Sequence, residues 1–334
     1  MRKIYTIKED KANVQEYYVK IILSAFEKKG FESYILDSID DAYSLSKDSI
    51  IVSISHYTTF KLALRGFKNI FYWVQGSSPD ESFMRHHSYI RKIVISLIEY
   101  FALSKARYIF MVSHGMLDYY NKKYHNDYSN KTYIMPCYNS EIKRNNFGFL
   151  NKYRKNVFCY VGGLSVWQCF SETVALYKQI EEMLPDAMFK VCTGDQDKAL
   201  KIIRSYDVKN YEVKYVRPEK LQSELSSCKF GFILRDISPV NYVATPTKLS
   251  NYLASGVIPI VSDSVSFFEE ILKNTRYAVV LKKGENGISK ILDLSEKNID
   301  ADDVYYEFED LFKRFYCNEL HITNIVNVIN KLKI

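Results

Sequence analysis

Hydrophobic and polar positions divide the first part of the chain into short apolar runs and longer amphipathic stretches. The short runs are rich in β-branched and aromatic residues and lie at 4–7, 33–36, 50–54, 70–74, 108–112 and 132–135. Such runs are typical of strands buried in a parallel sheet. Stretches with helical spacing, such as 14–29 and 90–105, lie between several of them. This pattern predicts a series of βαβ units.

A polar segment at 136–156 interrupts the pattern, which then resumes. Strands are expected at 157–161, 189–192, 211–216, 229–234, 258–261 and 278–281, with a helix over 168–184. Two successive βαβ series predict an α/β protein with two doubly wound, Rossmann-like lobes that face a central cleft. We expect one domain over 1–145 and a second over 156–300. The helices of a C-terminal segment, 301–334, follow the second sheet and are candidates to pack back across both lobes.

Composition restricts the class of protein. The 334 residues are 47% hydrophobic, which is enough for two ordinary domains, and the residues after the first strand form no apolar signal segment. Six cysteines are scattered without a Cys-x-x-Cys pair and are not grouped with histidines. We therefore expect reduced thiols in a cytoplasmic protein rather than a metal site or disulfides.

The net charge of +7 suits a nucleic acid, an anionic membrane surface or a phosphorylated substrate. The basic residues are spread along the chain, which disfavours nucleic acid. The segment 88–110 is strongly apolar, but its basic residues and Glu99 argue against a membrane-spanning helix. Two interpretations stay open for it. One is a helix enclosed by the sheet and its neighbours, and the other is a helix lying on an anionic lipid surface.

Candidate chemistry lies where the strands of the second half end, because ligands of open α/β sheets bind beyond the carboxyl ends of the strands. Gly162 and Gly163 follow one strand and precede a helix, an arrangement that lets backbone amides approach a phosphate. Gly194 follows the next strand, and Arg235 stands just past a third.

A further helix is predicted between Pro246 and Gly256, which are typical of a helix start and a helix end. Lys248 then lies in the first turn, where its charge opposes the helix dipole. A bound anion would remove this conflict, whereas the alternative is a solvated lysine without consequence. Together with Arg235, we favour a clamp for a diphosphate.

At these residues the sequence resembles the GT-B-fold, nucleotide-sugar glycosyltransferases of family four, especially bacterial enzymes of capsule and lipopolysaccharide assembly. The resemblance is carried by the segments 160–168 and 246–256 in the second half and by 72–81, 112–116 and 134–139 in the first. It implies a hexosyltransferase that moves a sugar from a nucleotide-diphosphate donor, most often a UDP-sugar, to a glycan or lipid-linked acceptor. It further implies retention of anomeric configuration, no required metal and a role in surface polysaccharide synthesis at the cytoplasmic face of the membrane. No cofactor is expected either, because the nucleotide-sugar would be a substrate.

The resemblance also implies roles for individual residues. Donor-binding residues are expected at Gly162, Gly163, Gly194, Arg235, Thr247, Lys248, Leu249 and Asn251. Acceptor-binding residues are expected at Gln75, Gly76, Glu81 and His114, and catalytic roles at Glu81, His114, Arg235 and Lys248. Glu81 is the candidate for acceptor contact or proton handling, with a surface carboxylate at a helix start as the alternative.

The sequence departs from the resembled family at three positions. Gly163 and Gln168 stand where the family commonly has Arg and Lys, and Asn251 stands where it has the second of two glutamates. Two rival functions therefore stay open. A non-catalytic partner subunit would keep the fold without the chemistry, and a non-hydrolysing sugar-nucleotide epimerase shares the two-lobed architecture but needs no acceptor.

Overall fold

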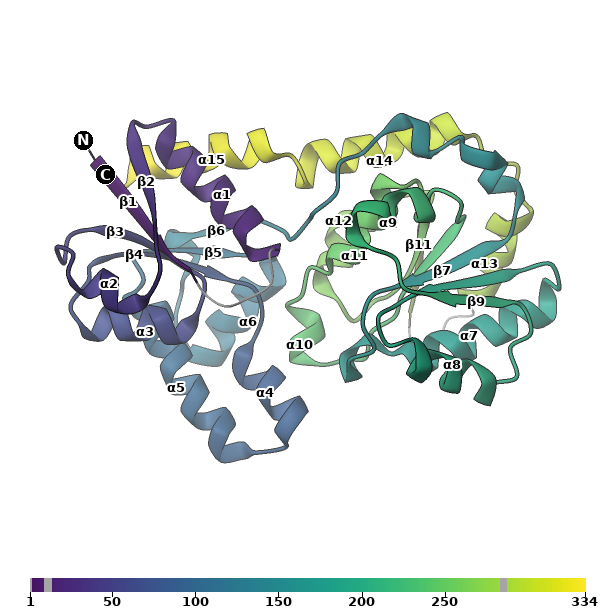
Figure 1. Ribbon diagram of the computed structural model, residues 1–334, viewed down its shortest axis with the longest axis horizontal. Helices are drawn as coiled ribbons and strands as arrows, with labels where there is room; N and C mark the ends of the chain where they lie inside the picture. The colour runs from purple at the N-terminus through teal and green to yellow at the C-terminus, as the bar shows by residue number, and fades with distance from the viewer. Residues whose placement is uncertain (1, 9–13, 283–286) are drawn as a thin grey trace. The chain divides into compact units, whose positions relative to one another are not determined.

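The computed structural model describes residues 2–8, 14–282 and 287–334 of the chain and divides into two compact units (Figure 1). Unit 1 comprises Met1–Cys137, Tyr242–Thr245 and Cys317–Ile334, and unit 2 comprises Tyr138–Asn241 and Pro246–Tyr316. The C-terminal segment is thus not one body, because its first helix belongs to unit 2 and its last helix belongs to unit 1.

Unit 1 is built on a six-stranded parallel sheet with the strand order β2-β1-β3-β4-β5-β6 in the described residues. Its strands are β1 (Arg2–Ile7), β2 (Phe31–Leu36), β3 (Ile50–Ser53), β4 (Asn69–Val74), β5 (Tyr108–Met111) and β6 (Thr132–Ile134). Its helices are α1 (Val14–Glu27), α2 (Ile39–Tyr43), α3 (His56–Leu64), α4 (Ser78–His86), α5 (Tyr89–Lys105), α6 (His114–Tyr124), the 3-10 turn η1 (Ser129–Lys131) and α15 (Asn318–Lys331). The last helix, α15, packs against α1, so the chain returns to the unit in which it began.

Unit 2 repeats this architecture, with the strand order β12-β11-β10-β7-β8-β9 in its described residues. Its strands are β7 (Val157–Val161), β8 (Met188–Cys192), β9 (Tyr211–Lys214), β10 (Phe230–Ile233), β11 (Ile258–Ser262) and β12 (Val279–Leu281). Its α-helices are α7 (Phe170–Met183), α8 (Gln196–Ser205), α9 (Pro218–Leu225), α10 (Pro239–Tyr242, whose last residue is counted with unit 1), α11 (Thr247–Ala254), α12 (Ser266–Leu272), α13 (Gly287–Glu296) and α14 (Ala301–Phe315). Three short 3-10 segments, η2 (Arg144–Asn146), η3 (Phe149–Arg154) and η4 (Val166–Gln168), complete it.

The strands confirm the predicted doubly wound architecture. Every apolar run identified in the sequence overlaps a strand of one of the two sheets, and the bounds differ by only a few residues. The central strands are buried along their whole length, as in β5 and β10. Burial on both faces explains why these strands are recognisable as continuous apolar runs.

The apolar segment 88–110 contains α5, and only one face of this helix is enclosed. Ile95 and Leu103 are buried, but Ile90 is 78% exposed and Leu97 is 63% exposed. The interpretation as a fully enclosed helix is therefore wrong for its outer face. Within the described part of the chain, no helix is both long enough and apolar enough to cross a membrane.

Candidate anion-binding site

The candidate donor site lies in unit 2 where the strand order reverses. β7 is flanked by β10 on one side and β8 on the other, and the chain runs outward from it in both directions. At such a point two neighbouring loops diverge and leave a crevice beyond the carboxyl ends of the strands. Gly162 follows β7 and Arg235 lies two residues past β10, so both belong to this edge.

Lys248 reaches the glycine turn from the first turn of α11. Its side chain is buried, its Nζ donates to Oε1 of Gln168 at 2.5 Å, and it lies 4.1 Å from the ring centroid of Tyr160. Gly162 has φ +108, and a Cβ at this position would lie 2.9 Å from Cε of Lys248. The backbone conformation therefore favours glycine at this position, and a Cβ here would also displace the end of the lysine side chain. The interpretation of Lys248 as a solvated lysine is wrong.

Arg235 is held in place by hydrogen bonds from its backbone N–H and from one nitrogen of its guanidinium group. Its backbone N–H donates to Oγ of Ser262 at 2.8 Å, and its Nη1 donates to the carbonyl oxygen of Trp167 at 2.7 Å. Its Nε is buried and has no hydrogen-bond partner among the residues that the structure describes. A buried donor without a partner is costly, so this nitrogen is available to an acceptor that the described residues do not supply.

The two cations are close enough to affect each other. Burial lowers the pKa of Lys248, and the positive charge of Arg235 lowers it further. Burial likewise lowers the pKa of Arg235. Among the described residues, no carboxylate forms an ion pair with either side chain, although buried charges are normally paired. This arrangement favours a bound anion, which would satisfy both cations.

Three other predicted donor residues lie in turns that follow strands or at the start of a helix. Gly163 is exposed, and its carbonyl oxygen accepts from the hydroxyl of Tyr160 at 2.8 Å. Gly194 is also exposed, in the turn after β8. Thr247 is the first residue of α11, directly before Lys248.

Two further predicted residues are engaged by the protein itself. The side chain of Leu249 is fully buried and belongs to the core. The Oδ1 of Asn251 accepts from the hydroxyl of Ser140. Gln168 was identified in the sequence only as a departure from the resembled family, and the structure places it against Lys248. Tyr160, which packs under the same lysine, was missed because an aromatic residue at a strand end is also typical of a core position.

The predicted acceptor residues of unit 1 lie at the carboxyl ends of two adjacent strands. Gln75 and Gly76 follow β4, and His114 is the first residue of α6, which follows β5. A Cβ on Gly76 would lie 2.5 Å from Oε1 of Glu81, so this pair is in contact. Glu81 is in the first turn of α4 and half-buried, and His114 is exposed.

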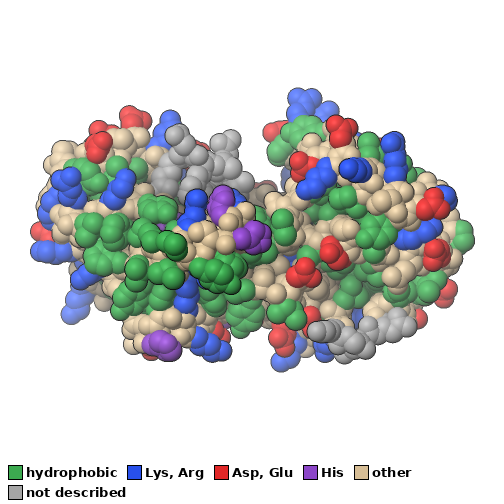
Figure 2. Space-filling model, turned by 90° about the horizontal axis from the view of Figure 1, so that it is seen from below, with side chains coloured by type: hydrophobic (Ala, Val, Ile, Leu, Met, Phe, Trp, Pro, Cys, Tyr) green, Lys and Arg blue, Asp and Glu red, His purple; other side chains and the backbone are tan. Residues whose placement is uncertain are grey.

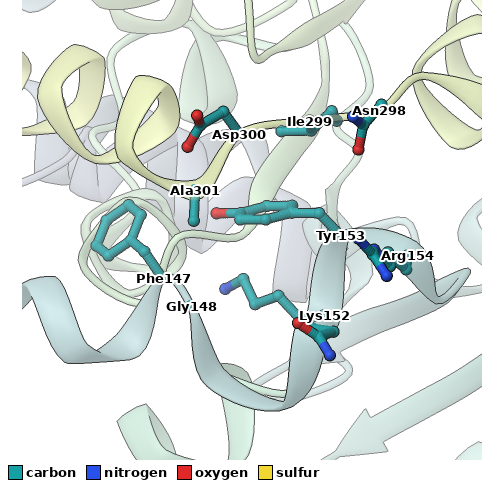
Figure 3. A pocket seen from close by; sticks show the side chains of 10 residues that line it. Phe147, Gly148, Lys152, Tyr153, Arg154, Asn298, Ile299, Asp300 and Ala301 are labelled. Carbon is teal, nitrogen blue, oxygen red and sulfur yellow. The ribbon is translucent and has the colours of Figure 1, made fainter.

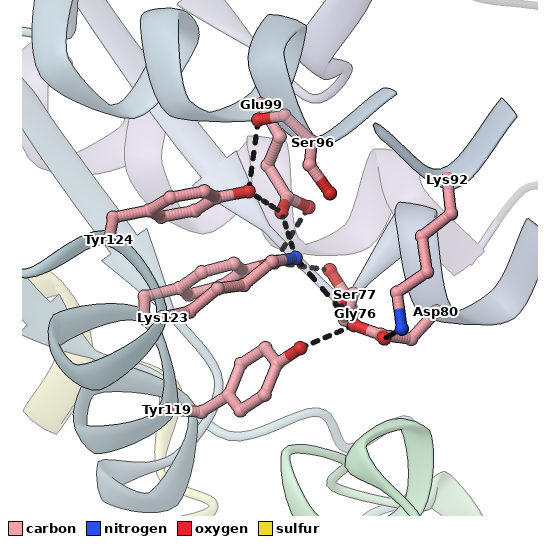
Figure 4. Close-up of polar contacts among 10 residues, drawn as sticks. Gly76, Ser77, Asp80, Lys92, Ser96, Glu99, Tyr119, Lys123 and Tyr124 are labelled. Carbon is pink, nitrogen blue, oxygen red and sulfur yellow. Dashed lines mark hydrogen bonds and ion pairs between the residues drawn. The ribbon is translucent and has the colours of Figure 1, made fainter. Parts of the chain in front are cut away.

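Sequence reasoning missed a buried polar network behind this segment (Figure 4). Asp80, next to Glu81, lies 2.8 Å from Nζ of Lys92, and Glu99 lies 3.0 Å from Nζ of Lys123. Burial alone would raise the pKa of Asp80, but hydrogen bonds from Lys92 and two hydroxyl groups lower it overall. Burial raises the pKa of Glu99.

This network fixes the loop that carries the acceptor candidates. The hydroxyl of Tyr120 donates to Oε1 of Glu99 and contacts the carbonyl oxygen of Gly76, each at 2.9 Å. The hydroxyl of Tyr119 contacts Asp80 at 2.5 Å. The network thus connects α4, α5 and α6. The one signal in the sequence was an acidic residue, Glu99, in the apolar middle of a helix whose ends are basic.

A separate cavity of about 310 Å³ lies in unit 2 between η3 and the start of α14 (Figure 3). Lys152 lines it, and burial lowers the pKa of this lysine to about 7. Its Nζ donates to the carbonyl oxygen of Ser255, so its polar head has a partner in the protein. None of the predicted donor residues lines this cavity. Within the described ranges, no three His, Cys, Asp or Glu side chains are grouped as a metal site would require.

Comparison with known proteins extends the description of the fold. No protein-family model and no curated protein matches the sequence. Sucrose-phosphate synthase from Thermosynechococcus elongatus has a TM-score of 0.72 at 13% identity, with 99% of this chain and 99% of that chain covered. HepE of Anabaena in complex with UDP-glucose has a TM-score of 0.71 at 10% identity, with 99% and 100% covered.

A TarM variant from S. aureus, in complex with fondaparinux, alpha-GlcNAc-glycerol and UDP, has a TM-score of 0.62 at 11% identity. The match covers 85% of this chain and 56% of that chain, so this chain spans little more than half of TarM. These neighbours share the two-lobed arrangement of parallel sheets that the sequence predicts. The chain therefore has the GT-B fold.

Proposed function

We propose that the protein is a glycosyltransferase that takes a sugar from a nucleotide-diphosphate donor. The observation that carries this proposal is the pair of buried cations, Arg235 and Lys248, which have no ion-pair partner among the described residues and flank the Gly162 turn. A diphosphate supplies the missing negative charge. As the bond to the sugar breaks, charge accumulates on the leaving diphosphate, and two fixed cations stabilise that charge without reorganisation.

The structural neighbours support a UDP-sugar as the donor. HepE was solved with UDP and with UDP-glucose, and the trehalose-6-phosphate enzyme from E. coli was solved with UDP-2-fluoro glucose. We propose a retaining, metal-independent transfer, with Gly162, Gly163, Gly194 and Thr247 contributing backbone or side-chain contacts to the donor.

The acceptor is proposed to bind at unit 1. Gln75, Gly76, Glu81 and His114 lie at the carboxyl edge of its sheet, where an acceptor hydroxyl would be oriented. We propose a glycan or a lipid-linked glycan as acceptor, in the synthesis of a surface polysaccharide. The six free cysteines support a reducing, cytoplasmic compartment for this reaction.

The test is a calorimetric and thermal-shift screen of UDP, GDP, CMP and their sugar conjugates. Wild-type protein is compared with Arg235→Met and Lys248→Met, which keep most of the buried volume but remove the charge. A ligand at roughly a hundred times its dissociation constant stabilises the fold by about 2.7 kcal/mol. We expect one nucleotide diphosphate to raise the melting temperature of the wild type and of neither variant.

The melting temperatures of the two variants without ligand provide a further check on the proposal. Because each removes one of two neighbouring buried cations, neither should melt at a lower temperature than the free wild type. Lys201→Met, at an exposed lysine of α8 in the same unit, is the matched control and should keep the ligand response. If no nucleotide binds, the non-catalytic partner subunit becomes the better explanation. Release of free sugar and nucleotide without an acceptor would favour the epimerase.

A further inference from the structure

Exposed apolar side chains of unit 1 gather on two neighbouring helices, α3 and α5. Of nineteen large hydrophobic side chains exposed in the described residues, eight lie on these helices: Tyr57, Leu64, Tyr89, Ile90, Ile93, Val94, Leu97 and Tyr100. The two helices pack against each other. Figure 2 shows the hydrophobic side chains gathered on this side of unit 1. A contiguous patch of this kind marks an interaction surface.

The outer face of α5 has the spacing of a helix that lies on an apolar phase. Ile90, Ile93, Val94 and Leu97 are between 50% and 78% exposed, and their spacing of three and four residues places them in one stripe. The opposite face, which contains Ile95, is buried in the unit. A surface helix of a soluble domain normally carries polar residues on its outer face, whereas the stripe on α5 is apolar and its exposed basic residues stand near the helix ends.

Basic residues outnumber acidic ones in the segment that carries this face, although Lys68, Arg85 and Lys92 each form an ion pair with a carboxylate. Between residues 56 and 105 the basic residues are Lys61, Arg65, Lys68, Arg85, Arg91, Lys92 and Lys105, and the acidic residues are Asp80, Glu81 and Glu99. Asp80 and Glu99 are buried. Arg91 and Lys105 stand exposed near the two ends of α5, and neither has an ion-pair partner in the described part of the chain.

We propose that the outer face of α3 and α5 binds the surface of an anionic lipid bilayer. The apolar stripe would enter the boundary between headgroups and acyl chains, and Arg91 and Lys105 would contact the lipid phosphates. Tyr89 and Tyr100 carry an aromatic ring and a hydroxyl, a combination that is enriched at this depth of a bilayer.

A second copy of the chain fits this face less well. In a two-fold symmetric contact, α5 would lie against α5 of the other copy. Both ends of the helix are basic, so either orientation would place cations opposite cations. An anionic membrane supplies the opposite charge along the whole face. The inference does not rest on the donor site, since it uses residues of unit 1 alone.

The test is flotation of the full-length, nucleotide-free protein with lipid vesicles. One set contains only phosphatidylcholine, and in the other about a third of the lipid is phosphatidylglycerol. We expect binding to the anionic set, weakened by high salt. Arg91→Gln should lower the partition coefficient by about fivefold, because each basic residue near an anionic surface contributes on the order of a factor of five. The triple variant Ile90→Gln, Ile93→Gln, Leu97→Gln should lower it by about tenfold or more.

The matched control replaces three exposed apolar residues elsewhere, Ile35→Gln, Met183→Gln and Tyr306→Gln, and should bind like the wild type. Melting temperatures show whether each variant is folded, and Arg91→Gln remains a test if the triple variant is not. Absence of binding to anionic vesicles would overturn the proposal. So would equal binding by the triple variant, or a wild-type dimer that the triple variant converts to a monomer.

Discussion

Replacement of Lys123 by methionine should destabilise unit 1 far more than an ordinary surface substitution. Its Nζ lies 3.0 Å from Oε2 of Glu99, a carboxylate whose side chain is 1% exposed. Asp80 also contacts Lys123 but retains Lys92 at 2.8 Å. Glu99 instead loses the one cation that the described residues place beside it. Two tyrosine hydroxyls still donate to this carboxylate, but they carry no charge.

The expected cost follows from the burial of the carboxylate. Removal of one partner from a buried ion pair costs about 3–5 kcal/mol, because the other charge stays buried and uncompensated. Burial raises the pKa of Glu99, and Lys123 opposes that rise. In the variant the folded-state pKa is therefore higher still. A carboxyl group with a raised folded-state pKa loses stability as pH rises through that pKa, so the cost should be largest near pH 8 and smaller near pH 5.

Hydrogen–deuterium exchange of peptides from α5 and α6 measures this cost locally. We expect Lys123→Met to lower protection by about a hundredfold or more near pH 8, after correction for intrinsic exchange rates. The loss should be smaller near pH 5. Lys122→Met, at the exposed neighbouring lysine, is the control and should change protection by less than about threefold. Equal effects in the two variants, or a cost that does not change with pH, would refute the reasoning.

Three further predictions concern unit 2. Gly162→Ala should weaken nucleotide binding by about tenfold or more in calorimetry, because its Cβ would displace Lys248 and φ +108 is strained for alanine. The folded-state pKa of Lys152 is lowered to about 7, so the unfolded state binds more protons and stability should fall from pH 9 to pH 7. Lys152→Met should remove that slope in denaturant titrations, up to about 1.4 kcal/mol per pH unit. Glu181→Ala should cost about 2 kcal/mol, measured by the same titrations, since two backbone N–H groups of the α8–β9 loop lose their acceptor.

The fold was predictable because its signals are local. A strand buried on both faces is apolar whatever its partners are, so β5 and β10 are recognisable without knowledge of their neighbours. The positions of Arg235 and Lys248 were predictable for a similar reason, since one follows a strand and the other opens a helix marked by proline and glycine. What the sequence did not predict is that both side chains are buried.

Other features depend on contacts between segments that are distant in the sequence. Glu99 was visible as an acidic residue in the apolar middle of a helix, but its cation, Lys123, lies 24 residues further along the chain. The outer face of α5 was ambiguous for a different reason. Both faces of this helix are apolar, so periodicity alone cannot distinguish the face that packs on the unit from the face that is exposed.

The buried lysines of unit 2 show why burial alone does not identify the anion site. Burial lowers the pKa of Lys152 to about 7 and that of Lys229 to about 8, and each Nζ donates to a backbone carbonyl oxygen. No other cation of the described residues shifts the pKa of either lysine. Arg235 and Lys248 differ, because the charge of the first lowers the pKa of the second. Packing gives no reason to bury two cations together, since each raises the cost of the other. Binding a ligand with at least two negative charges is a reason to bury them together, and a nucleotide diphosphate is such a ligand.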